Sequence, residues 1–301
     1  MWYIHADVSD TMFQDKFEDI DPTQISTKKM IGIPLLVLTF FILMVGVPML
    51  LPDYTGRFDL QLGMDLQGGT LAVITGVEVD PSIKGELEDH FDTHDVEMRP
   101  TDLGTALEAP AEIDLVELEN FVKEKYPDAE LSTSYIGPTM GEDLQRQARN
   151  ALIIAFVGMT IVVFIAFRSP LPSMVVILSA LLDMTMAVGF MVLFGVALEL
   201  GTVAALLMVI GYSVDSNILL TTKLLKRRGT LKDKVRGAMS TGITMTLTTI
   251  AAIFSLLIIS THPVLDSIAV VLLFALCADL MNTWMLNTGL LMWYLKRRRR
   301  R

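Results

Sequence analysis

Three aspartates lie inside long apolar stretches of the 301-residue sequence. Asp215 lies in "MVIGYSVDSNILL", Asp183 in "LLDMTMAV" and Asp279 in "VVLLFALCADLMNTW". A charged aspartate at the centre of a membrane helix costs roughly 2.5–3.5 kcal/mol, so it must face other helices, find a partner or hold a proton. A carboxyl group that alternates between neutral and ionised forms can carry protons. We therefore predict an ion pathway through these residues, with Asp215 as the candidate proton carrier. An aspartate paired to another subunit fits the sequence equally well.

Polar side chains near Asp215 supply the predicted environment of that pathway. Ser213 and Asn217 flank it in the sequence, and the apolar run at 238–260 carries Thr244 and Thr248 on one face. Hydroxyl groups on a membrane helix either bond their own backbone or reach a carboxyl group on another helix. The sequence leaves both alternatives open. It places no Lys, Arg or His in the middle of these runs, so we expect no ion pair within the chain to neutralise the aspartates.

The elements that position these residues are membrane helices. Hydrophobic residues make up 52% of the chain, and the mean hydropathy of +0.51 indicates a polytopic membrane protein with one polar insert. A membrane span requires about 20 apolar residues. Six runs meet this requirement, at about 31–51, 149–167, 173–195, 200–222, 238–260 and 265–293.

The basic residues predict the orientation in the membrane, because short loops rich in Lys and Arg stay in the cytoplasm. They gather at 28–29, at Arg168, between the fourth and fifth runs, and in the tail 296–301. We therefore expect a cytoplasmic acidic segment at 1–28, a first transmembrane helix at 29–51, an extracytoplasmic domain at 52–147, transmembrane helices 2–6 within 148–295 and a cytoplasmic basic tail at 296–301. The tail favours binding to anionic lipids.

The insert at 52–147 has the patterns of a small α+β domain. "GGTLAVITGVEV", "DVEMRP", "GTALEA" and "DAELSTSYIG" read as strands, while "PSIKGELEDHFD" and "IDLVELENFVKEKY" read as helices. This β-α-β-β-α-β order predicts a ferredoxin-like domain between the first two spans. The segment "GEDLQRQARN" then begins a helix that runs on into the second span.

Glycine-rich segments join the insert to the membrane helices at both ends. They contribute Gly63, Gly68 and Gly69 in "LGMDLQGGT" and Gly137, Pro138 and Gly141 in "YIGPTMGEDL". Glycine permits positive φ and close backbone approach, while proline fixes φ. These residues are predicted hinges or tight couplings between domain and membrane.

Charge and cysteine content exclude several functions. The insert holds 22 Asp or Glu against 6 Lys or Arg, which argues against nucleic acid as a ligand and favours a surface adapted to high salt. Cys277 is the sole cysteine, so neither an internal disulfide nor a thiolate metal site is expected. We expect no cofactor and no other metal site. Glu199 and Asp266 lie at the outer ends of their helices, where we expect them at the membrane interface.

The motifs "GMDLQGGT", "IGPTMGEDL", "AFRSP", "GYSVDSNILLTTKL" and "TLTTIAA", in this order, resemble the SecF family of the SecD/SecF protein-export machinery, in the resistance-nodulation-division superfamily. The small insert is similar to SecF rather than SecD. Thr241 lies near the position where many bacterial members carry an arginine. The acidic insert resembles archaeal members, with a halophile as the expected source.

The resemblance implies an auxiliary subunit of the Sec translocase in the cell membrane. Its partners would be SecD, the Sec channel and the translocating polypeptide, with anionic lipids at its basic tail. Export would be coupled to a proton gradient through Asp215, with Thr244 and Thr248 as its polar surroundings. Asp65 joins the glycines and Pro138 as a coupling residue in this scheme.

Three other functions compete with this interpretation. Two aspartates in a membrane could form an intramembrane protease, but the Gly-x-Gly-Asp motif of those enzymes is absent, so we expect no enzyme. A transporter subunit for lipids or small molecules belongs to the same superfamily. A third alternative is a purely structural partner of SecD that conducts no ion. The absence of the arginine near Thr241 favours it, because that absence weakens the case for a proton path. The sequence does not distinguish protons from sodium ions.

Overall fold

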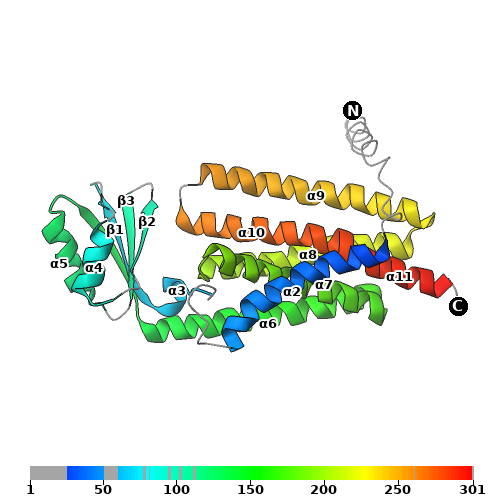
Figure 1. Ribbon diagram of the computed structural model, residues 1–301, viewed down its shortest axis with the longest axis horizontal. Helices are drawn as coiled ribbons and strands as arrows, with labels where there is room; N and C mark the ends of the chain where they lie inside the picture. Colours follow the sequence, from blue (N-terminus) through cyan, green and yellow to red (C-terminus); the bar gives the residue numbers. More distant parts are fainter. Residues whose placement is uncertain are drawn as a thin grey trace.

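The computed structural model describes residues 26–50, 60–76, 79–80, 82–93, 96–101, 104–110, 113–260 and 262–299. An elongated bundle of long helices carries a small sheet-containing domain at one end (Figure 1). Most of the predicted acidic segment 1–28, and residues 300–301 of the basic tail, lie outside the described residues.

Long apolar helices form the bundle. Within the described residues, five helical stretches are long and apolar enough to cross a membrane, and they coincide with the second to sixth predicted runs. The first predicted run falls on α2, a helix of 24 residues that packs along α7. The bundle elements are α2 (Thr27–Leu50), α6 (Pro138–Phe167), α7 (Pro170–Phe194), α8 (Leu200–Lys226), α9 (Leu231–Ile259), α10 (Pro263–Met281), η2 (Asn282–Asn287) and α11 (Thr288–Arg299).

The last apolar run is not one regular α-helix. A six-residue π-helical turn, η2, separates α10 from α11, although the backbone continues in one direction. Such turns arise where the regular i to i−4 bonding pattern widens, and they occur frequently at functional sites. The sequence analysis did not predict this turn.

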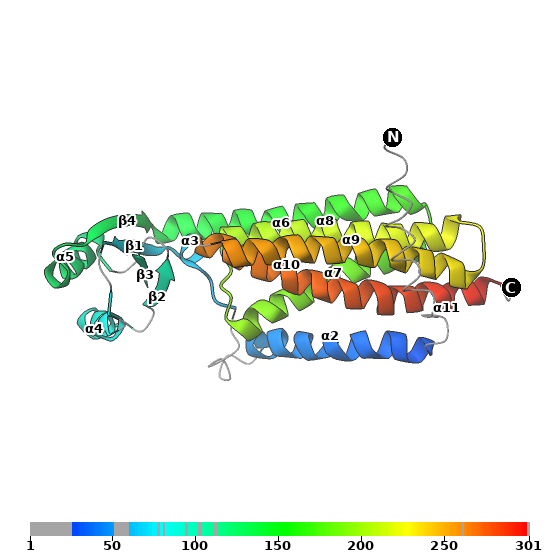
Figure 2. The same cartoon turned by 90° about the horizontal axis from the view of Figure 1, so that it is seen from above.

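Helix α8 holds the centre of the bundle. It packs against α6, α7, α9 and α10, and Figure 2 shows it among these helices when the bundle is viewed from above. The α7–α10 contact contains stacked rings, with the centroid of Phe274 4.9 Å from that of Phe190 and 4.8 Å from that of Phe194. Aromatic pairs at such distances contribute about 0.5–1.5 kcal/mol beyond simple burial.

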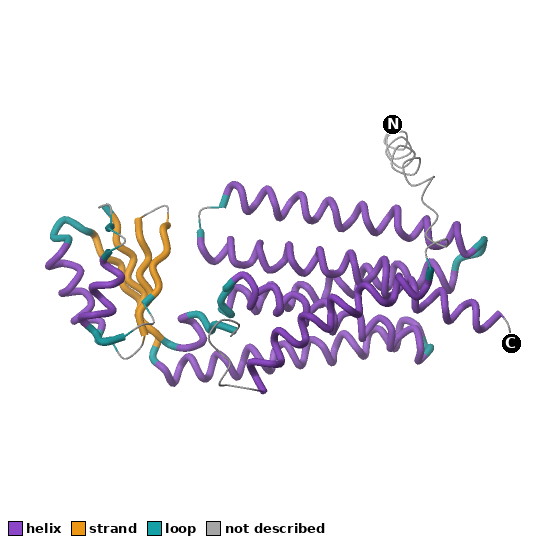
Figure 3. The backbone as a smooth tube through the Cα atoms, viewed as in Figure 1, coloured by secondary structure: helices purple, strands orange, loops and turns teal. Residues whose placement is uncertain are grey.

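The domain at the end of the bundle contains one four-stranded sheet. Its elements follow the order β1 (Gly69–Thr75), α4 (Ile83–His90), β2 (Glu97–Thr101), β3 (Gly104–Pro110), α5 (Leu115–Lys125) and β4 (Glu130–Ile136), after the short helix α3 (Met64–Gln67). The strands lie in the order β2-β3-β1-β4, and every neighbouring pair is antiparallel. Figure 3 shows both helices on the side of the sheet turned away from the bundle.

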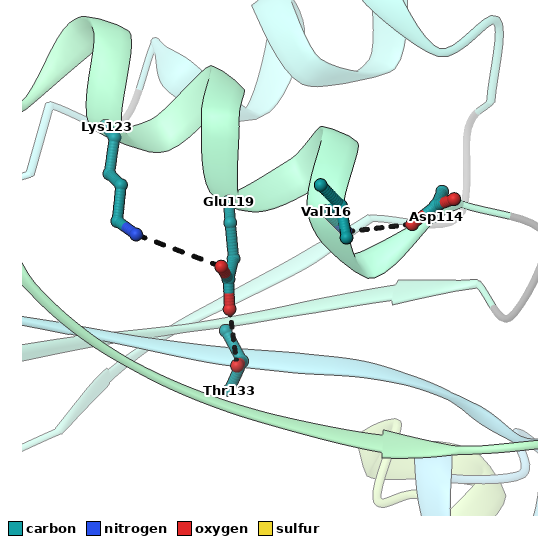
Figure 4. Close-up of polar contacts among 5 residues, drawn as sticks. All are labelled: Asp114, Val116, Glu119, Lys123 and Thr133. Carbon is teal, nitrogen blue, oxygen red and sulfur yellow. Dashed lines mark hydrogen bonds and ion pairs between the residues drawn. The ribbon is translucent and has the colours of Figure 1, made fainter.

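Helix α5 illustrates how local sequence forms these elements. Asp114 caps its first turn by accepting a hydrogen bond from the Val116 amide at 2.8 Å (Figure 4). Glu119 accepts a bond from Thr133 of β4 at 2.8 Å and pairs with Lys123 at 3.8 Å. The cap and the ion pair stabilise the helix itself, and the Glu119–Thr133 hydrogen bond joins it to the sheet.

The domain core lies between these helices and the sheet. Ile83 and Leu87 of α4, Leu118 and Val122 of α5 and Ile74 of β1 are fully buried in one cluster. Burial of such side chains stabilises by about 1.5–3 kcal/mol each. The alternating burial of β1 matches this one-sided cover, because successive residues of a strand point to opposite faces.

Truncation at the core of α5 should loosen the domain. We expect Leu118→Ala to destabilise it by about 2–5 kcal/mol, because the leucine is fully buried. Val116→Ala on the same helix is the matched control, since Val116 is 61% exposed. Hydrogen exchange of the α5 amides in the full chain would rise for Leu118→Ala only; equal exchange in both variants would contradict the packing described here.

Candidate functional site

The domain meets the bundle at a junction built around the start of α8. The Gly63 amide donates to the Leu198 carbonyl at 2.9 Å, and the Leu198 amide donates to the Gln61 carbonyl at 2.7 Å. These bonds form a short parallel bridge between Leu62 and Leu198. The segment that enters the domain is therefore tied directly to the chain that begins α8.

Glu199 corrects one expectation from the sequence. It is 8% exposed rather than open to the interface, and it caps α8 in a reciprocal arrangement with Thr202. A Cβ atom on Gly63 would lie 2.2 Å from the Glu199 Cγ atom. Glycine at 63 therefore allows this close approach, and Glu199 becomes part of the junction.

The predicted coupling glycines also meet around α3. Gly68 ends α3 at φ +83°, a conformation that other residues rarely adopt. Gly141 lies where a Cβ atom would approach the Leu66 carbonyl oxygen at 2.7 Å and the Gly68 nitrogen at 2.8 Å. The side-chain amide of Gln145 donates to that same Leu66 carbonyl at 2.8 Å. Helix α6 is thus pressed against α3.

The remaining coupling residues occupy defined positions at this junction. Gly137 is the N-cap of α6 and Pro138 its first residue, where proline is favoured because no amide hydrogen is needed. Gly69 begins β1 close to the Ala109 carbonyl oxygen. Asp65 is half-buried in the first turn of α3, where its charge faces the positive end of the helix.

A cluster of buried polar side chains lies inside the bundle, separate from this junction. It includes two of the three predicted aspartates, Asp183 and Asp279, which are 0% and 2% exposed. The other members come from α8 and from the π-helical turn: Ser213, Asn217, Asn282, Thr283 and Asn287. The sequence analysis predicted Ser213 and Asn217 but missed the three residues of η2.

Hydrogen bonds connect this cluster across four elements. Ser213 donates to Asp183 Oδ2 at 2.5 Å, and Asn282 donates to Asp183 Oδ1 at 2.6 Å. Thr283 lies 2.8 Å from Asp279 Oδ1 and 3.1 Å from Asn217 Oδ1. One network therefore joins α7, α8, α10 and η2.

Asn217 is the second hub of the network. Its amide group donates to the Ser213 carbonyl at 2.8 Å and approaches the Ser213 hydroxyl at 3.2 Å. Its Oδ1 atom accepts a hydrogen bond from Asn287. The π-helical turn places both Thr283 and Asn287 against this one amide oxygen. Asn282, Thr283 and Asn287 could have been identified as a polar stripe on one face of the last apolar run.

Asp215 lies elsewhere, on the surface of the bundle. It is exposed, as are Met208, Gly211 and Tyr212 of the same helix. These four residues recur at helical spacing, so they form one stripe along α8. Asp215 therefore does not face the other helices of this chain. Of the three ways to accommodate it in a membrane, a partner outside the chain and a bound proton remain.

The predicted hydroxyl residues of α9 bond their own helix. Thr244 donates to the Ser240 carbonyl and Thr248 to the Met245 carbonyl, each at 2.8 Å. Thr244 is half-buried and Thr248 is exposed. The sequence left open whether these hydroxyl groups bond their own backbone or a carboxyl group on another helix. In the structure they bond their own backbone.

A basic group joins α8 to α9 at the end of the bundle far from the domain. The Lys223 ammonium group donates to the Gly237 carbonyl at 2.6 Å and to the Thr241 hydroxyl at 2.7 Å. Lys223 belongs to the basic group between the fourth and fifth apolar runs, and its side chain reaches α9. It lies two helical turns beyond Asp215 on α8.

The buried cluster brings carboxyl, amide and hydroxyl groups within hydrogen-bonding distance of one another. Among the described residues, no group of three or more His, Cys, Asp or Glu side chains could hold a metal ion. Cys277 lies exposed on α10 rather than packed inside the bundle.

Comparisons with known proteins give a consistent result. The family model described as "Protein export membrane protein SecD/SecF, C-terminal" matches residues 117–297. The protein-export membrane protein SecF of Pyrococcus furiosus is 41% identical over 297 residues, which covers 96% of this chain and 97% of that protein. SecF of Haloferax volcanii is 38% identical over 288 residues, covering 92% of this chain and 95% of that protein.

Among solved structures, SecDF of Thermus thermophilus, described as a translocon-associated membrane protein, superposes with a TM-score of 0.68 at 19% identity. The match covers 90% of this chain and 38% of that chain. At this level of identity the match shows the fold. The chain spans less than half of the SecDF polypeptide.

The packing at Gly141 can be tested with a single methyl group. We expect Gly141→Ala to destabilise the junction by about 1–3 kcal/mol, because the new Cβ atom would overlap backbone atoms of α3. Gly158→Ala on the same helix is the control, since a Cβ atom there meets nothing within 4 Å. Hydrogen exchange of residues 64–68 should increase only in Gly141→Ala, and unchanged exchange there would contradict a tight coupling.

Proposed function

The chain belongs to the SecF family of protein-export membrane proteins, and we propose that it promotes polypeptide export as an auxiliary subunit of the Sec translocase, paired with a SecD chain. The observation that carries this proposal is the 41% identity to a SecF protein over almost the whole of both chains. The relatives' names describe export rather than a chemical reaction, so we assign no enzymatic activity.

The chain is a multi-pass membrane protein. We assign it six spans by adding α2 to the five long apolar helices, because α2 packs along α7 and carries only apolar or uncharged residues after Lys29. We assign the sheet domain to the ferredoxin-like class on the basis of its element order and its antiparallel strand order. The domain limits proposed from the sequence, 52–147 and 148–295, are kept.

The orientation follows from the distribution of charge. The basic residues around the α8–α9 connection and the end of α11 lie at the end of the bundle opposite the sheet domain (Figures 1 and 2). Short basic loops remain in the cytoplasm. We therefore place both termini in the cytoplasm and the sheet domain outside the cell. The basic tail then binds anionic lipids on the inner face of the membrane.

Pairing with SecD is supported by the surface of α8. A charged carboxyl group exposed to lipid costs several kcal/mol, whereas a partner protein can supply donors to it. The exposed stripe of Met208, Gly211, Tyr212 and Asp215 combines an acid with a small residue that permits close helix contact. The chain also corresponds to 38% of the solved SecDF polypeptide, which leaves the remainder for a second chain.

In this scheme Asp215 carries protons at the contact with SecD. Thr244 and Thr248 of α9, the helix that packs against α8, were the predicted polar surroundings of Asp215. Lys223 donates a hydrogen bond to Thr241 of the same helix. Export couples to this site because α8 begins at the junction with the sheet domain. A change at Asp215 acts on the helix that Gly63 and Glu199 tie to the outer domain.

The outer domain then acts on the polypeptide that emerges from the Sec channel. Helix α6 runs without a break for 30 residues from the domain into the bundle, so it transmits movement between the two. The hinge of that movement would lie at the start of α6, at Gly137, Pro138 and Gly141. Both α6 and α8 reach the same junction.

A structural role is the second candidate, and one observation favours it. The α9 hydroxyls bond their own backbone, so no described hydrogen bond connects them to Asp215. A chain that conducts no ion would then use Asp215 only to fix SecD in place. A transporter subunit for lipids or small molecules gains no support from the relatives' names.

Removal of the Asp215 charge separates these two roles. In the proton-carrier role, Asp215→Asn should reduce export to about the level of cells that lack the chain, while co-purification with SecD stays normal. Asp215→Glu is the control, because it keeps a titratable carboxyl group at the same position, and it should restore much of the export. Loss of co-purification would assign a structural role, and normal export with Asn would exclude proton transfer at Asp215.

The proposed SecD contact can be tested by cross-linking. In a chain with Cys277→Ala, we expect Tyr212→Cys to give a cross-link to SecD with a short bifunctional reagent in membranes. Ile165→Cys is the control, because Ile165 is 66% exposed on α6 and lies outside the α8 stripe. The reverse pattern would move the SecD contact to α6.

A further inference from the structure

The two buried aspartates have no role in the function proposed above. Asp183 lies on α7 and Asp279 on α10, inside the bundle, while Asp215 lies at its surface. Consecutive residues of η2 bond the two carboxyl groups, since Asn282 bonds Asp183 and Thr283 bonds Asp279. The two carboxyl groups lie close enough to interact directly.

The hydrogen bonds identify Asp183 as the ionised member. Each of its two oxygens accepts a short bond, from Ser213 at 2.5 Å and from Asn282 at 2.6 Å. A carboxylate accepts at both oxygens, and several donors can hold it ionised even when it is buried. Ser213 is itself held by the Asn217 amide, which fixes the direction of its hydroxyl group.

Asp279 has the opposite environment. Its Oδ1 atom accepts a bond from Thr283 at 2.8 Å, while its Oδ2 atom is fully buried and has no hydrogen bond of normal geometry among the described residues, although Ser216 lies nearby. Two adjacent carboxyl groups in a low-dielectric interior are stabilised when one of them holds a proton that the other accepts. A proton on Asp279 would supply that missing bond and would avoid two adjacent charges, which cannot both persist in a low-dielectric interior.

A second buried polar atom beside Asp183 lacks a partner in the described part of the chain. The Oδ1 atom of Asn282 is fully buried and without a partner among the described residues, although the same amide bonds Asp183 through its nitrogen. Unsatisfied buried polar atoms are rare in folded proteins, and a functional role or a bound water or ion accounts for some of them. The π-helical turn, which brings Asn282 and Thr283 to the two carboxyl groups, is itself a typical feature of functional sites.

The charged groups on the helices packed around the pair do not neutralise it. Lys223 of α8 is bound to Gly237 and Thr241, Glu199 caps the start of α8, and Asp215 is exposed. Asp266 lies in the first turn of α10, and the basic residues of α9 lie in its first two turns. Within the described residues, no ion pair with a Lys or Arg side chain is found at Asp183 or Asp279.

We propose that Asp183 and Asp279 form a proton-binding pair inside the bundle, which holds one proton between the two carboxyl groups, with Asp279 as the acid and Asp183 as the carboxylate. This site is separate from Asp215 and does not depend on the role proposed for it. Loss of the proton would leave two adjacent charges, so the bonds that join α7, α10 and η2 would rearrange. Proton release is thereby linked to helix packing.

The test is infrared spectroscopy of the purified full chain in lipid nanodiscs, with ¹³C-labelled aspartate. At neutral pH, exposed carboxyl groups are ionised, so a protonated-carboxyl band that shifts with the label reports a buried aspartic acid. We expect this band in an Asp215→Asn background, where the surface aspartate cannot contribute. If the band is absent in that background, the proposal is wrong. This result would say nothing about whether Asp215 carries protons.

Two further variants in that background assign the proton. Asp279→Asn should abolish the band, because Asp183 remains ionised, whereas Asp183→Asn should retain the band at a shifted frequency. Ser213→Ala should also shift the band, because it removes a donor to Asp183 without changing either carboxyl group. This measurement remains available if Asp279→Asn fails to fold. A band that survives Asp279→Asn would overturn the assignment.

A sodium ion among the same oxygens is the competing occupant. Titration of sodium chloride against choline chloride at constant pH and ionic strength distinguishes the two. The proton pair predicts a band that sodium leaves unchanged. Loss of the band on addition of sodium would replace the proposal with a sodium site, because the ion would displace the proton.

Discussion

A carboxylate inside an apolar bundle needs hydrogen-bond donors, and the way Asp183 obtains them organises the centre of this protein. Its two oxygens accept bonds from α8 and from η2, so three elements are joined at one side chain. Apolar surfaces alone do not select which helix faces meet in a membrane, because lipid tails are as apolar as leucine. Polar bonds of this kind specify the packing.

Helix α8 connects the three regions described above. Its first turn is capped by Glu199 at the junction with the sheet domain, its buried face contributes Ser213 and Asn217, and its exposed stripe contains Asp215. One rigid element therefore reaches the outer domain, the buried cluster and the proposed SecD contact. In the proposed function, a change in charge at Asp215 acts on the junction through this one continuous helix.

The bundle places its acids in two different environments. Asp183 accepts hydrogen bonds at both oxygens and Asp279 at one, all from their own chain, whereas Asp215 is exposed. Burying a charge costs more than any single hydrogen bond returns, so the proposed shared proton would stabilise the inner pair, whereas another protein could stabilise the outer acid. In these proposals the same residue type serves packing inside the chain and contact outside it.

Much of the architecture could be predicted from the sequence. The apolar runs identified the long helices, because about 20 apolar residues are needed to cross a bilayer, and alternation and turn residues identified the strands and helices of the domain. Positive φ and close backbone approach were expected at the predicted coupling glycines, and Gly68 and Gly141 have these features. The continuity of α6 from domain to bundle also followed from its sequence.

The site could be predicted only in part, because the positions of side chains depend on which helices become neighbours. Composition and spacing determined that three aspartates lie in membrane helices and that Ser213 and Asn217 accompany them. Only the tertiary structure decided that Asp183 and Asp279 meet inside the bundle while Asp215 faces outward, that a π-helical turn adds Asn282 and Thr283, and that Glu199 is buried against Gly63. The physical reason is that an apolar run shows little difference between its faces, so the rotation of each helix about its axis is determined by contacts with residues distant in the sequence.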